Sequence, residues 1–115
     1  MLDLKPIVYQ QLCTVGLPCY YELIVSKDTE LPCITYLEME NMADEEGNTL
    51  GYSTIRFSVK VWAKDVRTLS LTSISIDEKM RLLGFSRVTT NELWLDGIGQ
   101  RQLLYSCKAV ENFNQ

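Results

Sequence analysis

The chain of 115 residues is 46% hydrophobic and 23% charged, which is close to the average soluble globular protein and argues against a disordered chain. This length gives room for a single domain over residues 1–115, built around one hydrophobic core. The net charge of −4 argues against a basic surface that would bind nucleic acid by neutralising its phosphates.

The first part of the chain predicts a helix and a strand. Apolar residues at helical spacing predict the helix over residues 4–12, with Asp3 as its N-cap and Pro6 in its first turn. A compact run of β-favouring residues predicts the strand over residues 19–25.

A second predicted strand, over residues 33–42, leads into a long acidic loop over residues 43–51. The nine residues of this loop exceed the about two to five of a common hairpin connection, and such loops are often either mobile or used in binding. The two interpretations agree if the loop is mobile alone and ordered in an assembly. The candidate protein-contact residues in the loop are Asp44, Glu45, Glu46 and Asn48.

The clearest pattern is a strand over residues 54–62, where apolar and polar side chains alternate. Strict period two predicts an antiparallel strand with one buried and one wet face. Its apolar residues are Ile55, Phe57, Val59 and Val61. By alternation, Trp62 falls on the polar face of this strand. Because protein interfaces are enriched in tryptophan, Trp62 is a candidate protein-contact residue in addition to those of the acidic loop. The alternative is a side chain that covers the rim of the helix layer.

A second helix is predicted over residues 65–83, with Asp65 or Thr68 as its cap. Gly84 fits the left-handed position that follows a helix, and Phe85 supplies the hydrophobic contact of a Schellman motif. The apolar stripe of the helix is Leu69, Ile76, Met80 and Leu83. The charged residues expected to face mostly water are Asp77, Glu78, Lys79 and Arg81.

The last predicted element is a hairpin with strands over residues 85–95 and 101–110. Asp96-Gly97 predicts its turn, because glycine supplies positive φ without strain. A polar tail follows from about residue 111. The element order is therefore α-β-β-β-α-β-β, which predicts an α+β fold in which two helices pack on a mainly antiparallel sheet of four to five strands.

The sequence lacks the residues of a catalytic or cofactor site. It contains no histidine, the usual base for a nucleophilic serine or cysteine, and Gly97-x-Gly99 has no third glycine and no helix after it. We therefore expect no enzyme and no cofactor. The alternative is a hydrolase in which Glu38 and Glu40 act together, since residues i and i+2 of a strand share a face. A solvated sheet face is the favoured interpretation of this pair.

The cysteines and the apolar runs point to an intracellular protein without a metal. No pair of cysteines has C-x-x-C spacing and no histidine could complete a metal site, so we expect free thiols that behave as small buried hydrophobic groups. No apolar run approaches the roughly 18 residues of a membrane span, and the first residues lack the basic start of a secretion signal. The four cysteines are Cys13, Cys19, Cys33 and Cys107.

Several segments occur in a fixed order between about residues 4 and 110. In chain order they are a first helix, Pro32-x-Ile34-x-Tyr36, a polar loop with Gly47 and Asn48, Phe57-Ser58-Val59-Lys60-Val61-Trp62-Ala63, a helix that closes with Leu82-Leu83-Gly84-Phe85-Ser86-Arg87, and a hairpin with Asp96-Gly97 and Tyr105. This ordered set resembles the small tail-completion proteins of long-tailed bacteriophages, the group of tail terminators and head-to-tail joining proteins.

The resemblance implies a structural subunit of a phage or prophage ring, typically a hexamer, in the virion tail. Such a ring caps the tail tube, contacts the tail-tube and head-completion proteins, and assembles in the host bacterial cytoplasm without a membrane. DNA passes through it without specific binding, which fits the acidic charge balance. Tail terminator and joining protein both stay open. The alternative function is a cytoplasmic ferredoxin-like adaptor or small-ligand module, with a pocket of convergent polar groups.

Overall fold

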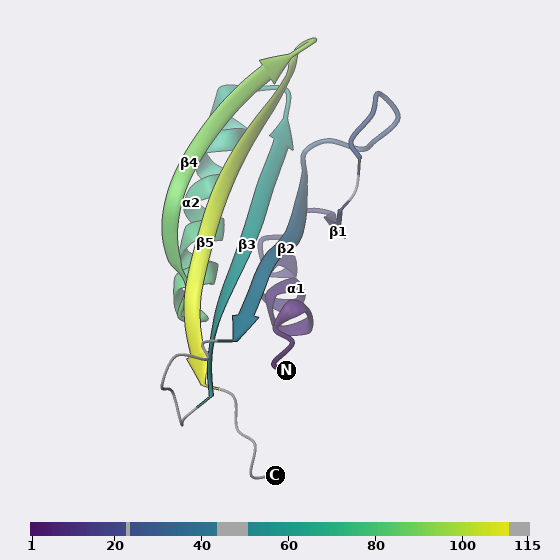
Figure 1. The fold of residues 1–115 in the computed structure, drawn as a ribbon. Helices are drawn as coiled ribbons and strands as arrows, with labels where there is room; N and C mark the ends of the chain where they lie inside the picture. Colours follow the sequence, from purple (N-terminus) through teal and green to yellow (C-terminus); the bar gives the residue numbers. More distant parts are fainter. Residues whose placement is uncertain (23, 44–50, 111–115) are drawn as a thin grey trace.

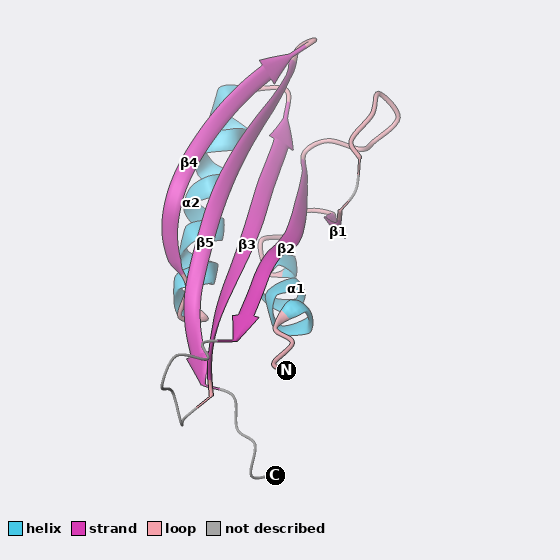
Figure 2. Cartoon of the chain, in the orientation of Figure 1, coloured by secondary structure: helices cyan, strands magenta, loops and turns pink. Residues whose placement is uncertain are grey.

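The structure is a computed structural model that describes residues 1–22, 24–43 and 51–110. Its elements are α1 (Lys5–Cys13), β1 (Cys19–Tyr21), β2 (Cys33–Ala43), β3 (Tyr52–Ala63), α2 (Val66–Leu82), β4 (Ser86–Leu95) and β5 (Ile98–Val110) (Figures 1 and 2). The five strands form one sheet in the order β1-β2-β3-β5-β4. The predicted α+β class and the order α-β-β-β-α-β-β are confirmed. The acidic loop and the polar tail lie outside the described residues, apart from Ala43 and Gly51 at the ends of the loop.

The sheet is antiparallel except at its first strand. β2, β3, β5 and β4 pair antiparallel, whereas β1 runs parallel to β2 with Cys19 opposite Ile34. The predicted strand over residues 19–25 is wrong in length, because β1 ends at Tyr21 and Glu22 takes a positive φ of 54°. The element order also differs from the β-α-β-β-α-β order of ferredoxin-like folds.

The first helix begins one residue later than its predicted cap. Leu4 occupies the N-cap position of α1 and has no side-chain cap bond, so the prediction of Asp3 as N-cap is wrong. The Asp3 carboxylate nevertheless accepts a hydrogen bond of 3.1 Å from the Lys5 N–H. Pro6 lies in the first turn as expected, because a proline there removes an amide that has no helical partner in any case.

Both ends of α2 follow the predicted chemistry. The Asp65 side chain accepts the Thr68 N–H at 2.9 Å and caps the first turn. At the other end Gly84 takes a φ of +93°; its N–H donates to the Arg81 carbonyl, and the Phe85 N–H donates to the Met80 carbonyl at 3.1 Å. These two bonds define a Schellman motif, which turns the chain from α2 into β4.

The core lies between the two helices and one face of the sheet (Figure 1). The predicted buried face of β3 is confirmed, since Ile55, Phe57, Val59 and Val61 are all 0% exposed. Helix α2 contacts β3 and β5, while Val8 and Leu12 of α1 complete the same core. The molecule is elongated, with principal extents of 50 × 23 × 23 Å. Among the described residues both helices lie on one face of the sheet, so the other face carries no helix.

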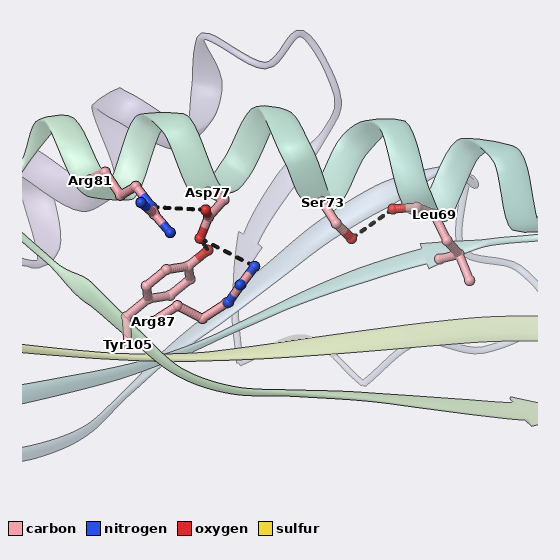
Figure 3. Close-up of polar contacts among 6 residues, drawn as sticks. All are labelled: Leu69, Ser73, Asp77, Arg81, Arg87 and Tyr105. Atoms are coloured by element: carbon pink, nitrogen blue, oxygen red, sulfur yellow. Dashed lines mark hydrogen bonds and ion pairs between the residues drawn. The ribbon is translucent and has the colours of Figure 1, made fainter.

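A polar cluster links α2 to the sheet at the end near Gly84 (Figure 3). Asp77 accepts a hydrogen bond of 2.9 Å from the Tyr105 hydroxyl and one of 2.9 Å from Arg81, and Arg87 of β4 lies 3.7 Å away. The prediction that Asp77 faces water is therefore wrong. Burial, and then the bond to Asp77, raise the pKa of Tyr105, so its hydroxyl remains a hydrogen-bond donor.

Candidate protein-contact surface

Trp62 lies on the sheet face opposite the helices, which we call the open face. In the sheet register its neighbours are Cys33 on β2 and Gln100 on β5. Its indole N–H donates to the Thr35 hydroxyl at 2.9 Å, and the Lys60 ammonium lies 5.9 Å from the ring centroid. The predicted placement of Trp62 on the polar face is confirmed. Its ring is held in one orientation by this hydrogen bond, which leaves the indole as a fixed platform.

The open face is drier than the alternating pattern predicts. Ser58 is only 3% exposed, and its hydroxyl accepts a hydrogen bond of 2.9 Å from the Gln102 side-chain amide. Lys60 and Trp62 are half-buried. Cross-strand contacts among long side chains therefore cover the backbone on this face, and water reaches it less than it would on a fully solvated sheet.

Two hollows, each of ≈ 380 Å³, flank Trp62 on the open face. The first is lined by the segment after β1 and by strands β2 and β3, and the second by the segment 25–27 and the tip of the β4–β5 hairpin. Residues that line the first include Ile24, Leu37, Ser58 and Lys60. Those of the second include Val25, Leu93, Leu95, Ile98 and Gln100.

Three exposed apolar side chains surround Trp62. Ile24 is 88% exposed, Leu93 is 61% exposed and Leu95 is 69% exposed, and each lines one of the two hollows beside the indole. We call Ile24, Trp62, Leu93 and Leu95 the Trp62 surface. A fixed aromatic ring with apolar neighbours is typical of a protein contact, because such residues lose unfavourable hydration when a partner covers them.

β4 forms one edge of the sheet, and all ten of its residues are exposed. The Glu92 carboxylate accepts a hydrogen bond of 2.6 Å from Arg101 of β5 and one of 2.9 Å from the Trp94 indole N–H. These bonds, with Trp94 the larger cause, lower the pKa of Glu92. Glu92 is therefore charged and directed back onto its own sheet.

The other candidate residues are placed differently by the structure. Asp44, Glu45, Glu46 and Asn48 lie outside the described residues, so their contact roles stay predictions. Ile24, Leu93 and Leu95 were not predicted as contact residues, because Ile24 is distant in sequence from the β4–β5 hairpin and only the folded sheet brings all three beside Trp62.

The carboxylate pair proposed for a hydrolase is not assembled. A bulge between Glu38 and Glu40 places Glu38 opposite Phe57 and Glu40 opposite Arg56. Since Phe57 and Arg56 point to opposite faces, the expectation that the two glutamates share a face is wrong. Glu40 forms an ion pair of 3.2 Å with Arg56, whereas Glu38 has a buried Oε2 atom with no hydrogen-bond partner in the described part of the chain.

The cysteines are free thiols with different exposures. Cys33 is buried, as expected of a small hydrophobic group, but Cys13 is exposed. Burial raises the pKa of Cys33 to about 11, and burial with the nearby Cys13 and Cys33 raises the pKa of Cys19 to about 12. These two thiols are therefore protonated at neutral pH and weak nucleophiles. Among residues 1–22, 24–43 and 51–110, no three metal-binding side chains converge.

Across the described ranges, no helix has both the length and the apolar character needed to cross a membrane.

The fold has a counterpart among solved structures. A chain from the virion of a native gene transfer agent (GTA) particle superimposes with a TM-score of 0.65 and 9% sequence identity. The match covers 90% of this chain and 92% of that chain. No protein-family model matches the sequence, and the search of curated proteins found no match. At this identity the similarity shows a shared fold over nearly the whole length of both chains.

Proposed function

We propose that the chain is a structural subunit of a phage or prophage tail-completion ring, which caps the tail tube and joins it to the head connector. The observation that carries the proposal is the fold shared with a chain of a gene transfer agent virion over 90% of this chain. The ordered segments that resemble tail-completion proteins span the same elements, from α1 to β5. In this proposal the chain binds other virion proteins and catalyses no reaction.

The surfaces of the molecule fit a ring subunit. A ring needs heterologous contacts, in which two different patches of each subunit meet. The Trp62 surface on the open face and the backbone edge of β4 are candidate contact patches that share Leu93 and Leu95. In the ring, which we propose to be a hexamer, they would serve contacts with neighbouring copies, the tail-tube protein and the head-completion protein. The net charge of −4 supports a lumen that lets DNA pass without specific binding.

Deleting the gene from the phage or prophage that encodes the chain tests this function. We expect tails of incorrect length or tails without attached heads, seen by negative-stain electron microscopy of the particles. A plasmid copy of the wild-type gene should restore normal particles, and this control excludes effects on neighbouring genes. Normal tail length with attached heads after the deletion would contradict the proposal.

The substitution Trp62→Ala tests the Trp62 surface within the same assembly. Because hot-spot aromatic residues carry much of a contact's affinity, we expect the yield of joined particles to fall at least about tenfold. The matched control is Trp62→Phe, which keeps an aromatic ring but loses the bond to Thr35. Circular dichroism of both purified variants should show folded protein. Normal assembly with Trp62→Ala would show that Trp62 does not contribute to a contact in the particle.

A further inference from the structure

The outer edge of β4 presents a regular row of backbone groups. Leu95 and Ile98 flank the two-residue Asp96-Gly97 turn, whose φ angles of 52° and 77° are both positive, so these two residues form a hydrogen-bonded pair. Hydrogen-bonded and non-hydrogen-bonded pairs alternate along an antiparallel ladder. Counting back along β4 from Leu95, the next hydrogen-bonded pairs with β5 are therefore those of Leu93 and Asn91.

The backbone groups of the residues between these pairs point away from β5. Thr90, Glu92 and Trp94 belong to the non-hydrogen-bonded pairs with β5, so their backbone N–H and C=O groups point away from the sheet. In the described part of the chain no strand pairs with this side of β4. The strand therefore offers backbone donors and acceptors in the arrangement that an added strand would use.

The charges of β4 do not protect this edge. Natural sheets guard exposed edges with lysine, proline or charges directed at the approaching strand. β4 contains no lysine and no proline, and its two charged side chains bind inward. Arg87 lies 3.7 Å from Asp77 of α2, and Glu92 lies 2.6 Å from Arg101 of β5. The bulge between Arg87 and Thr89 disturbs only the start of the strand. An exposed and unguarded edge of this length is typical of a strand that pairs in an assembly.

A second edge with outward backbone groups lies on β2. The Ile34 N–H donates to the Pro18 carbonyl at 2.8 Å, and the Tyr36 carbonyl accepts from the Glu22 N–H at 3.0 Å. The backbone groups of Ile34 and Tyr36 therefore point away from β3. Beyond the bulge, the pairing with β3 directs the backbone groups of Asn41 and Ala43 to this same outer side. β1 pairs only with residues 34–36. The end of β2 near Ala43 is therefore beyond the reach of β1.

We propose that β4 of one copy pairs with the end of β2 of a second copy, so that copies of the chain join head to tail through a continuous sheet. The strand directions permit it. From β2 through β3 and β5 to β4 every pair is antiparallel, so β4 runs opposite to β2. A second copy in the same orientation then meets β4 with an antiparallel strand, the arrangement in which the backbone groups described above face one another.

One register satisfies both backbones and buries apolar side chains. In this register Trp94 lies opposite Asn41 of the second copy and Glu92 lies opposite its Ala43. The outward N–H and C=O groups of these residues then face one another across the contact and can form hydrogen bonds. Leu93 then lies opposite Met42 on the open face. These two side chains are 61% and 57% exposed in the single chain, and cross-strand apolar pairs of this kind stabilise a sheet. The contact uses different patches on the two copies and is therefore heterologous. The inference deepens the proposed function, because a ring needs a contact of this kind.

A disulfide between two copies tests this register with the purified full chain. Leu93 and Met42 would form a non-hydrogen-bonded pair, whose Cβ atoms are close enough for a disulfide. We expect a mixture of Leu93→Cys and Met42→Cys chains at millimolar concentration to form a linked dimer, with mass spectrometry locating the bond between positions 93 and 42. Each variant alone and the wild type, which has the exposed Cys13, are the controls. No linkage above these controls would overturn the proposal, and so would preferential linkage of Leu93→Cys to itself, which indicates β4 pairing with β4.

The substitution Ala43→Pro tests the backbone bonds of the same contact. It removes an outward N–H that the proposed pairing uses, whereas the control Ala43→Ser keeps that N–H. We expect Ala43→Pro to weaken self-association at least about tenfold in sedimentation equilibrium, with thermal unfolding close to that of the control. Equal association of the two variants, or a wild type that is monomeric at millimolar concentration, would overturn the proposal. These outcomes leave the gene-deletion test unaffected, so the two proposals fail separately.

Discussion

Val59→Asp will unfold the protein, whereas Lys60→Asp will leave it folded. Val59 is 0% exposed and its side chain belongs to the core beneath the helices. An isolated carboxylate there either loses its hydration or takes up a proton, at a cost of several kcal/mol. Small domains are stable by only about 5–15 kcal/mol, so this one change removes much or all of the stability.

Lys60 is the matched control because it is the next residue of the same strand and lies on the open face. Its ammonium lies 5.9 Å from the centroid of the Trp62 ring, and losing this half-buried contact costs about 0.5–2 kcal/mol. Thermal unfolding followed by far-ultraviolet circular dichroism distinguishes the two variants. If Lys60→Asp were as damaging as Val59→Asp, the assignment of the two faces of β3 would be wrong.

Tyr105→Ala will destabilise the protein by about 3–5 kcal/mol, in line with removing a large buried aromatic ring. Tyr105 is 0% exposed and is the largest fully buried side chain of the described residues. Its ring packs in the core, and its hydroxyl donates to Asp77 on α2 at 2.9 Å. The substitution therefore leaves a cavity between the helix and the sheet and also removes a hydrogen bond between them.

Tyr105→Phe separates these two effects. It keeps the ring but leaves Asp77 without the hydroxyl donor, which should cost about 1–3 kcal/mol because the acceptor is charged and only 16% exposed. Urea unfolding of both variants gives the two free energies of unfolding. If Phe were as destabilising as Ala, the hydroxyl rather than the ring volume would dominate the contribution of Tyr105.

The parts of the fold that follow from local chemistry could be predicted from the sequence. Alternation of residues 54–62 fixed the buried face of β3, since a strand has a side-chain period of two. Gly84 marked the end of α2 and Asp96-Gly97 marked the hairpin turn, because both need a positive φ that glycine adopts easily. Each of these signals depends only on residues close together in the chain.

The features that could not be predicted depend on contacts between distant residues. The bulge at Glu38 and Glu40 is set by the pairing of β2 with β3 and reverses the face of every residue beyond it. Asp77 looks like a solvated helix residue until Tyr105, 28 positions away, places a hydroxyl beside it. The exposed edge of β4 was missed for the same reason, because only the strand order shows which strand is at the edge.

The elongated shape of the molecule changes how its mass must be measured in solution. The radius of gyration of 15.4 Å exceeds the about 13 Å expected for a compact domain of this length. An elongated particle experiences more friction than a sphere of equal mass, so a single copy will leave a gel-filtration column early and resemble a larger species. Light scattering, which reports mass independently of shape, is therefore the measurement that distinguishes one copy from two.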